Sequence, residues 1–460
     1  GKKKMNLENT LKKANQYHLY EHYESIKDEK AKEAFKNELK LLDFNHLNNM
    51  FKQSLASQND PISVQPPPKK YILDLVTKDE RQTLTEKGLD ILATGSIGIL
   101  LLAGGQGTRL GFDHPKGLYK LDLPGKKSLF QYQAEQIRKL EQLVEAKTKK
   151  SVTIYWYIMT SASNEKETKD FFKTFTFFGL KESQVVFFNQ GSLPCFTTKG
   201  SIMIDPTGNT LAKAPNGNGG IYLALEKEGI LKHMNDHGVT HVHSYCVDNV
   251  LTKVADPVFI AQCMAKKVKF GSKVIAKQYP EERVGVFAEK NGEMAVVEYS
   301  EIPKDMQADP RFNEANMVNF FYSVSFLEEC ANVLATQEHY HIAKKMIPSI
   351  NVSTKRVEKQ AGIKLELFNF DIVYLAGSNV LLAHVDRALE FAPLKNKEGK
   401  DSPVTCVELL SNRNKSLIVA AGGSLSGEGV CEISPLFSYN GEGIPAKAYN
   451  LPLHLESSSN

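Results

Sequence analysis

The sequence predicts an α/β protein with a mostly parallel central sheet flanked by helices, a helical N-terminal region and a small C-terminal β domain. Three observations predict this class. Residues 2–60 contain neither glycine nor proline and carry apolar residues at helical spacing. From residue 97, apolar strand-like runs alternate with amphipathic segments, the order typical of parallel sheets. Beyond residue 415, short strand-like and glycine-rich stretches replace this alternation.

Length and composition allow several domains and exclude some classes of partner. The 460 residues, 42% hydrophobic and 24% charged, match an ordinary globular protein of two to four domains. Lysine and arginine number 57 against 53 acidic residues, and a net charge of +4 gives no reason to expect nucleic acid. The longest aliphatic run, residues 97–103, is far shorter than the roughly 18 residues of a membrane span. We therefore expect neither nucleic acid nor a membrane as partner.

The cysteines and the N-terminal residues predict a cytoplasmic protein. Six cysteines are spread singly, with no C-x-x-C pair: Cys195, Cys246, Cys263, Cys330, Cys406 and Cys431. Such spacing indicates reduced thiols. The first residues lead into polar, helix-like sequence without the apolar segment of a secretory signal.

Proline and glycine mark the expected domain boundaries. Pro61 and the prolines of residues 66–68 end the first helical stretch, and residues 79–92 resume a helical pattern before the composition becomes strand-like. We expect a helical N-terminal region over 1–95, a main domain over 96–398 and a small β-rich domain over 399–460.

Within the main domain the expected elements alternate between strand and helix. They are a strand over 97–102, a helix from Leu129, an alternating strand over 152–158, a helix from about Ile221 and a strand over 239–247. Residues 416–420 are expected to form a strand of the C-terminal domain.

The strongest local signal is LLLAGGQGTRLGFDHPKG, residues 100–117, in which a buried strand runs into a glycine-dense loop. Its glycines allow backbone N–H groups to approach a phosphate and permit unusual dihedrals: Gly104, Gly105 and Gly107. Arg109 and Lys116 add two cations, which a simple turn would not need. We interpret this segment as a phosphate-binding loop beyond the carboxyl end of a strand.

Two familiar phosphate loops do not fit this spacing. The ATPase pattern requires Gly-Lys-Ser/Thr, whereas Gly111 is followed by Phe112. The dinucleotide fingerprint requires a third glycine where Leu110 stands. Downstream, residues 128–131 form a capping-box pattern that predicts the start of the next helix.

On this loop the chain resembles the eukaryotic UDP-N-acetylglucosamine pyrophosphorylases, sugar-nucleotide pyrophosphorylases whose loop reads L-x-x-G-G-x-G-T-x-L-G-x-x-x-P-K. Every fixed position is filled, from Leu102 to Lys116. Gln106 and Arg109 resemble the N-acetylhexosamine branch more than the UDP-glucose branch. The resemblance implies a Rossmann-like fold of the nucleotide-diphospho-sugar transferase type.

The resemblance continues in order to about residue 445 and implies a UTP site. In residues 189–194 it assigns Gln190 to the uracil edge, a role that suits an amide offering both donor and acceptor. In residues 214–220 it places Gly217 behind the nucleotide, and Lys364 near the phosphates. The implied UTP-binding residues are Leu102, Ala103, Gly104, Gly105, Lys116, Gln190, Gly217, Asp248 and Lys364.

The same resemblance implies a sugar-phosphate site. Glu298, in the segment V-V-E-Y-S-E, would accept hydrogen bonds from sugar hydroxyls, and Asn316 would lie beside the sugar. The family commonly has glycine where Ala315 stands. The implied sugar-phosphate-binding residues are Asn218, Glu298, Tyr299, Asn316 and Lys395.

Asp248 is the predicted ligand of a divalent metal, Mg²⁺ or Mn²⁺. It follows the strand expected over 239–247, which places a carboxylate at the sheet edge beside the phosphate loop. Magnesium is typically held by one or two carboxylates, waters and substrate phosphates. His241 and His243 share a face of that strand, but alternate strand residues do so by default and no third ligand is apparent.

The predicted activity is transfer of uridylyl from UTP to N-acetylglucosamine 1-phosphate, with in-line attack at the α-phosphorus and release of pyrophosphate. Arg109, Lys116 and Lys395 are the predicted catalytic residues, acting by positioning and charge neutralisation. We expect no general base and no covalent intermediate.

Other functions stay open at this point. A broad-specificity UDP-sugar or UDP-glucose pyrophosphorylase would share the fold and the chemistry. Two further alternatives belong to other classes of protein. The loop cations argue against a non-catalytic nucleotide-sugar-binding protein. The missing third glycine argues against a dinucleotide-dependent oxidoreductase. The sequence does not decide between N-acetylglucosamine and N-acetylgalactosamine 1-phosphate, or between monomer and weak dimer.

Overall fold

The computed structural model describes residues 6–457, whose contacts form two compact units. Unit 1 comprises the chain up to Pro61 with residues 190–223 and 331–371, and unit 2 comprises residues 62–189, 224–330 and the chain from Ile372. Each unit is thus assembled from separate stretches of sequence. The boundaries expected after residues 95 and 398 stay predictions.

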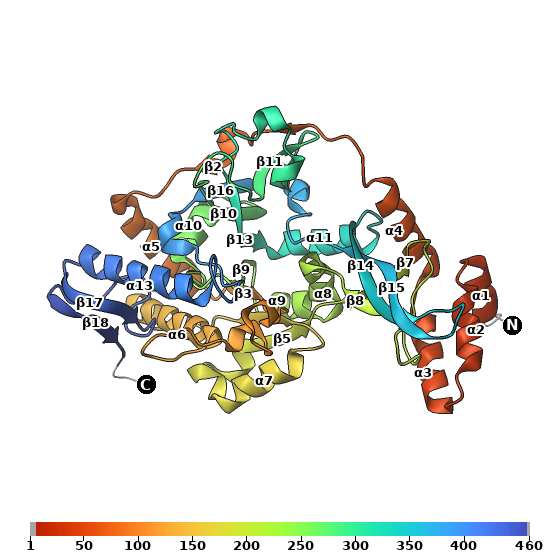
Figure 1. Ribbon diagram of the computed structural model, residues 1–460. Helices are drawn as coiled ribbons and strands as arrows, with labels where there is room; N and C mark the ends of the chain where they lie inside the picture. Colours follow the sequence, from red (N-terminus) through yellow and green to blue (C-terminus); the bar gives the residue numbers. More distant parts are fainter. Residues whose placement is uncertain (1–5, 458–460) are drawn as a thin grey trace. The chain divides into compact units, whose positions relative to one another are not determined.

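Unit 1 combines the N-terminal helices with a three-stranded and a two-stranded sheet (Figure 1). Its helices are α1 (Leu7–Lys13), α2 (Tyr17–Ser25), α3 (Glu29–Lys40) and α4 (Phe44–Ala56). Its strands are β6 (Ser192–Pro194), β7 (Phe196–Thr197), β8 (Lys213–Pro215), β14 (His341–Ile350) and β15 (Val357–Glu366). The predicted helical N-terminal region is confirmed: Asp28 and Asp43 cap α3 and α4, and Phe35 and Leu39 are fully buried.

Unit 2 contains the central sheet and most of the helices. Its helices are α5 (Lys78–Ala93), α6 (Leu129–Thr148), α7 (Glu165–Thr174), α9 (Ile230–Asp236), α10 (Pro257–Lys266), α12 (Arg387–Glu390) and α13 (Pro403–Ala420). Its strands are β1 (Val64–Gln65), β2 (Ile72–Leu73), β3 (Ile97–Leu102), β4 (Trp156–Thr160), β5 (Val185–Asn189), β9 (His241–Cys246), β10 (Phe270–Ile275), β11 (Val286–Lys290), β12 (Glu293–Val297), β13 (Ala315–Ser323), β16 (Val380–His384), β17 (Ser424–Ile433) and β18 (Ala448–Leu455). Two further helices, α8 (Ile221–Lys227) and α11 (Val324–Ala335), run from one unit into the other.

The main path of the central sheet has the order β2-β16-β10-β13-β9-β3-β4-β5. All neighbours along it are parallel except β13, which is antiparallel to both β10 and β9. The predicted mostly parallel sheet is therefore confirmed. The antiparallel β13 leads from the β11–β12 hairpin back into the sheet.

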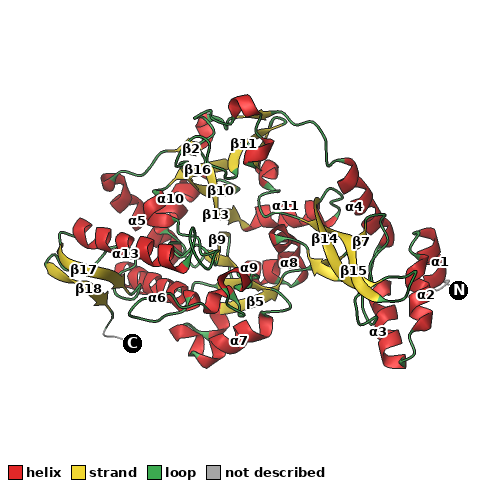
Figure 2. Cartoon of the chain, in the orientation of Figure 1, coloured by secondary structure: helices red, strands yellow, loops and turns green. Residues whose placement is uncertain are grey.

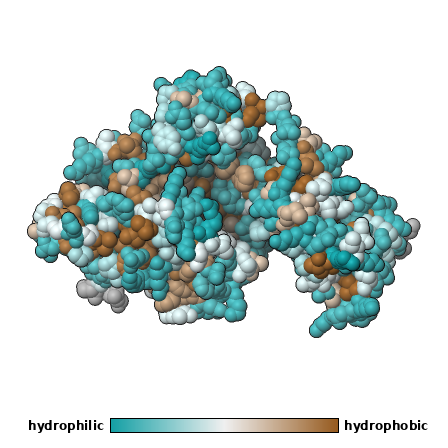
Figure 3. Space-filling model, in the orientation of Figure 1, coloured by the Kyte–Doolittle hydropathy of each residue, from teal (hydrophilic) through white to brown (hydrophobic). Residues whose placement is uncertain are grey.

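The core of unit 2 explains why these runs form strands. All six residues of β3 are buried, as expected for a strand covered on both faces. Ile99 of β3, Trp156 of β4, Ile137 of α6 and Ile260 of α10 belong to one hydrophobic cluster. Figure 2 shows helices packed around these strands, and Figure 3 shows hydrophilic side chains over most of the visible face.

Most expected elements are present, with three differences. The Ser128 hydroxyl caps α6 by accepting from Gln131 N (3.1 Å), while the Gln131 side chain donates instead to Glu135 (2.9 Å). The strand expected from residue 152 begins only at Trp156. Residues 416–420 are the end of α13, so the expected strand there is wrong: Ser402 caps this helix, Pro403 occupies its first position, and Ile418 faces the core.

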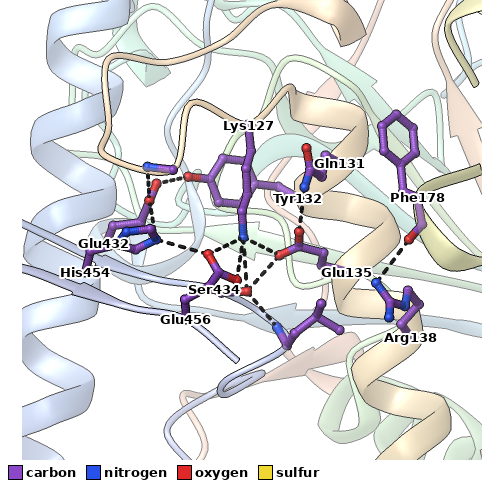
Figure 4. Close-up of polar contacts among 12 residues, drawn as sticks. Lys127, Gln131, Tyr132, Glu135, Arg138, Phe178, Glu432, Ser434, His454 and Glu456 are labelled. Atoms are coloured by element: carbon purple, nitrogen blue, oxygen red, sulfur yellow. Dashed lines mark hydrogen bonds and ion pairs between the residues drawn. The ribbon is translucent and has the colours of Figure 1, made fainter. Parts of the chain in front are cut away.

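A buried polar cluster anchors the C-terminal strands to the start of α6 (Figure 4). The Lys127 ammonium donates to Glu135 Oε1 (2.8 Å), Ser434 Oγ (3.2 Å) and Glu456 Oε1 (3.0 Å). Beside it, Glu432 accepts from the Tyr132 hydroxyl. The segment that precedes α6 is thus tied to the residues that directly follow β17 and β18.

Over residues 6–457, no helix is both long and apolar enough to cross a membrane. All six cysteines are unpaired, as the spacing predicted.

Candidate functional site

The glycine-rich loop follows β3, the strand at which the chain changes the side of the sheet to which it adds strands. Strand β3 lies between β9 and β4, and the chain runs from β3 to β4 on one side and later returns to β9 on the other. Leu102 O accepts from Val247 N (3.2 Å), and Ala103 N donates to Met159 O (2.8 Å). Loops beyond the carboxyl ends of such strands are where open α/β sheets bind ligands.

The loop is folded back on itself by backbone hydrogen bonds. Gly107 N donates to His114 O (3.1 Å), and Lys116 N donates to Gly105 O (3.3 Å). A Cβ on Gly107 would lie 2.9 Å from Phe112, so this glycine is needed for close packing. The unusual dihedral falls on Gly111, with φ +71°, whereas Gly107 has φ −87°. A Cβ on Gly105 would meet nothing within 4 Å, so its backbone is open to a ligand.

A cavity of ≈ 250 Å³ lies against this loop. It is lined by Gln106, Gly107, Thr108, Arg109, Leu110, Lys116, Asp248 and Lys395. Three cationic side chains therefore face one carboxylate, an excess of positive charge that suits a phosphate-rich ligand. The structure thus brings together the three predicted catalytic residues and the predicted metal ligand.

Neutral groups hold two of the three cations of this cavity. The Lys116 ammonium donates to Leu394 O (3.0 Å), and Arg109 Nη2 donates to Asn396 Oδ1 (2.6 Å). The sequence analysis did not predict Asn396 as a site residue, although it directly follows Lys395. Because a carbonyl or amide oxygen carries no net charge, both cations keep their charge available for an anion.

The pKa values of the thiols near the cavity, Cys246 and Cys406, are raised. Burial, and then the charge of Asp248, raises the pKa of Cys246. Burial, and then the charge of Asp401, raises the pKa of Cys406 to about 12. Both thiols therefore stay protonated near neutral pH.

The donor set of the cavity suits Mg²⁺. Among residues 6–457 there is no group of three or more histidine, cysteine or acidic side chains that could hold a metal. An ion at Asp248 would need water and substrate phosphates to complete its coordination, which is the usual situation of Mg²⁺. His243 is no metal ligand, since its Nδ1 accepts from Ala255 N (3.0 Å) and its Nε2–H faces Asn319 Oδ1 (2.7 Å).

Glu298 and Asn316 both lie next to Gly285. A Cβ on Gly285 would lie 3.3 Å from a carboxylate oxygen of Glu298, and Asn316 N donates to Gly285 O (2.9 Å). Partial burial and the neighbouring Glu301 raise the pKa of Glu298. Tyr299 lies at this place too, with the Arg283 guanidinium 5.7 Å from its ring centre.

Unit 1 contains four other predicted residues. Gln190 Nε2 donates to Gly217 O, and Gly217 has φ +85° with Leu367 O 2.2 Å from where a Cβ would stand. The side-chain oxygen Oδ1 of Asn218 accepts from Asn369 N (2.9 Å). Lys364 lies on β15, three residues before Leu367. Backbone and side chains thus hold one polar loop beside the end of β15.

Within unit 2 the predicted residues fall at two places. The first is the cavity, with Leu102, Ala103 and Gly104 leading into its loop. The second is the region of Gly285, with Glu298, Tyr299 and Asn316. Asn316 precedes the part of β13 that pairs with β9, at the end of the sheet where Asp248 follows β9.

Comparison with known proteins gives consistent matches. The family model described as UTP–glucose-1-phosphate uridylyltransferase matches residues 5–424. A probable UDP-N-acetylglucosamine pyrophosphorylase of Dictyostelium discoideum is 36% identical over 97% of this chain and 96% of its own length. UDP-N-acetylglucosamine diphosphorylase 2 of Arabidopsis thaliana is 39% identical over 88% of this chain and 84% of its own length.

Solved structures agree with these matches. The crystal structure of the uridine diphosphate N-acetylglucosamine pyrophosphorylase from Trypanosoma brucei superposes with a TM-score of 0.84 at 30% identity, covering 100% of both chains. A UDP-glucose phosphorylase from the same organism, 18% identical with a TM-score of 0.57 over 87% of this chain and 78% of that one, shares the fold.

Proposed function

This chain belongs to the UTP–glucose-1-phosphate uridylyltransferase family, among its UDP-N-acetylglucosamine pyrophosphorylases, and we propose that it forms UDP-N-acetylglucosamine and pyrophosphate from UTP and N-acetylglucosamine 1-phosphate. The observation that carries this proposal is the cavity at the glycine-rich loop. Arg109, Lys116 and Lys395 face Asp248 there, an arrangement suited to a triphosphate.

The reaction is a single displacement at the α-phosphorus of UTP. A phosphate oxygen of the sugar 1-phosphate forms the new bond, and the bond from the α-phosphorus to the oxygen that bridges it to the β-phosphorus breaks. The bonding electrons leave with pyrophosphate. Since the nucleophile is already an anion, no side chain needs to remove a proton.

The cations serve to bring two anions together. Sugar phosphate and UTP repel one another, and Arg109, Lys116 and Lys395 offset that repulsion where charge moves toward the leaving group. The open backbone at Gly105 supports a role for the loop amides in the same task. Alignment of the two reactants supplies much of the remaining rate gain.

Asp248 is the residue that would hold Mg²⁺ or Mn²⁺ in this enzyme. When bound, the ion would neutralise phosphate charge. A lone carboxylate among polar side chains supports this assignment, because such ions share their coordination with water and substrate.

The remaining predicted residues are proposed to select the two substrates. Gln190, Gly217 and Lys364 would bind uridine and its phosphates. This is supported by the bond from the Gln190 amide to Gly217 O, since close contact with Leu367 holds the Gly217 loop. Asn218 of unit 1 and Glu298, Tyr299 and Asn316 of unit 2 stay the predicted sugar-phosphate-binding residues. The Glu298 carboxylate lies beside Gly285, to which the Asn316 main chain is bonded, and this proximity in the fold supports a common ligand for the two residues.

The enzyme is proposed to work in the cytoplasm, as a monomer or weak dimer. Six unpaired cysteines favour a reducing compartment. Size-exclusion chromatography with light scattering measures the oligomeric state.

The test is a product assay with UTP, Mg²⁺ and N-acetylglucosamine 1-phosphate. The proposal expects UDP-N-acetylglucosamine and pyrophosphate to form in equal amounts. UTP hydrolysis without sugar transfer, or binding without turnover, would overturn it. N-acetylgalactosamine 1-phosphate in a parallel assay decides whether the second hexosamine is accepted.

A further inference from the structure

A buried asparagine joins the two segments that carry Asp248 and Lys395. Asn249 directly follows Asp248 and is 5% exposed. Its carbonyl oxygen accepts from Ala392 N (2.9 Å) and Leu251 N (3.2 Å), and its amide nitrogen donates to Glu390 O (2.9 Å). One side chain therefore satisfies three buried main-chain groups in both segments.

The main chain repeats this connection on either side of Asn249. Leu394 N donates to Asp248 O (2.8 Å), and Val250 N donates to Ala392 O (3.0 Å). Leu394 O then accepts from Lys116 (3.0 Å). The cavity residues Asp248, Lys395 and Lys116 thus depend on one junction for their relative positions.

A buried ion cluster fixes the other side of this junction. The Lys273 ammonium, on a side chain 1% exposed, donates to Glu390 Oε1 (2.5 Å) and Asp256 Oδ2 (2.7 Å). Lys253 lies 3.8 Å from the second Glu390 oxygen. Two lysines and two carboxylates balance one another here, and their contacts hold the Glu390 side chain in place.

We propose that Asn249 is a positioning residue, which holds the segment carrying Lys395 against the loop carrying Asp248 so that both charged groups keep their places in the cavity. The role requires an amide, because one group must both accept and donate. Aspartate has the same shape but cannot donate to Glu390 O, and it buries a charge beside that carbonyl. The effect on catalysis rests on the proposed function, whereas the anchoring itself does not.

The test compares Asn249→Asp with the matched variant Asn414→Asp. Asn414 is 1% exposed, lies in α13 of the same unit and also donates to a main-chain oxygen, that of Cys431 (3.0 Å), but it belongs to neither of the two segments that Asn249 joins. Three quantities are measured for each: the melting temperature, kcat and KM for UTP, and hydrogen exchange of the peptide over residues 390–396.

Both variants are expected to lose thermal stability. Only Asn249→Asp is expected to speed exchange at Leu394 N–H and to lower kcat by about tenfold to a hundredfold, with a smaller change in KM. If Asn249→Asp does not fold, Asn249→Ser receives the same measurements, since serine is too short to reach both segments.

Unchanged exchange over residues 390–396 would overturn the anchoring role whatever the activity. Faster exchange with wild-type kcat would overturn the link to catalysis. A wild-type protein that makes no UDP-sugar would overturn the proposed function instead, and the exchange measurement would still decide the anchoring.

Discussion

The ammonium group of Lys116 donates a hydrogen bond to the main-chain oxygen of Leu394, at 3.0 Å, although 278 positions separate the two residues. This bond joins the glycine-rich loop to the segment that carries Lys395. The partner is a neutral carbonyl, so the lysine is held in place without losing its charge to a carboxylate. A cavity with cations held in this way is prepared for an anionic ligand.

Replacement of either loop cation is expected to slow turnover. Arg109→Ala and Lys116→Ala should each lower kcat by about two to three powers of ten, the usual effect of removing one preorganised charge donor. Lys126→Ala is the control, since Lys126 is exposed and pairs with Asp122 outside the cavity. Steady-state pyrophosphate release measures all three variants. Wild-type turnover in Arg109→Ala or Lys116→Ala would remove that residue from the mechanism.

Activity is expected to require a divalent metal, with Asp248 as its protein ligand. Asp248→Asn should need more Mg²⁺ to reach half of its maximal rate, because an amide is a weaker ligand than a carboxylate. A Mg²⁺ titration of wild type, Asp248→Asn and the exposed control Asp122→Asn measures this. Full activity in excess chelator would contradict a metal-assisted reaction.

The polar cluster in Figure 4 is expected to contribute to stability. Lys127→Met leaves the Glu135 carboxylate buried without its cation, since these side chains are only 7% and 4% exposed. Breaking a buried pair in this way costs about 3–5 kcal/mol. Urea unfolding of Lys127→Met and the exposed control Lys126→Met checks the loss. Equal stability of the two variants would show that the cluster contributes little.

Because of His243, the free energy of unfolding is expected to decrease as the pH falls. Burial, and then the charge of Lys273, lowers the pKa of His243 to about 4, from its ordinary value of 6.5. Between these values the unfolded chain takes up a proton that the folded chain does not, so the free energy of unfolding decreases as the pH falls from 6.5 to 4. Above pH 6.5, His243 does not contribute to the pH dependence of the free energy of unfolding.

His243→Gln should flatten the pH dependence in that window, and the exposed His339→Gln controls for the loss of a histidine. Urea unfolding at a series of pH values gives the slope for each variant. A slope in His243→Gln equal to that of wild type would show that His243 does not stay neutral on folding.

Features that depend on a local pattern of residues could be predicted from the sequence. The glycines and cations of residues 100–117 stand close together in the chain, so their common loop could be read directly. The run Ser-Leu-Ile-Val-Ala at 416–420 has the composition of a strand, but the cap that begins its helix stands far upstream, at Ser402.

Contacts between distant segments could not be predicted in this way. The bond from Lys116 to Leu394 and the junction at Asn249 depend on how the sheet brings separate loops together. No local pattern marks which asparagine will be buried with three main-chain partners. The place of Asp248 after a predicted strand suggested this residue and the resemblance suggested Lys395, and both line one cavity with the loop cations.

The most direct test of the proposed function is competition between N-acetylglucosamine 1-phosphate and glucose 1-phosphate for UTP. A pocket built to hydrogen-bond the acetamido group leaves buried polar groups unpaired when that group is missing. We expect kcat/KM to favour N-acetylglucosamine 1-phosphate by at least about a hundredfold, roughly two hydrogen bonds at 1.4 kcal/mol per tenfold. Equal use of the two sugars would contradict the assignment and indicate a broad-specificity UDP-sugar pyrophosphorylase.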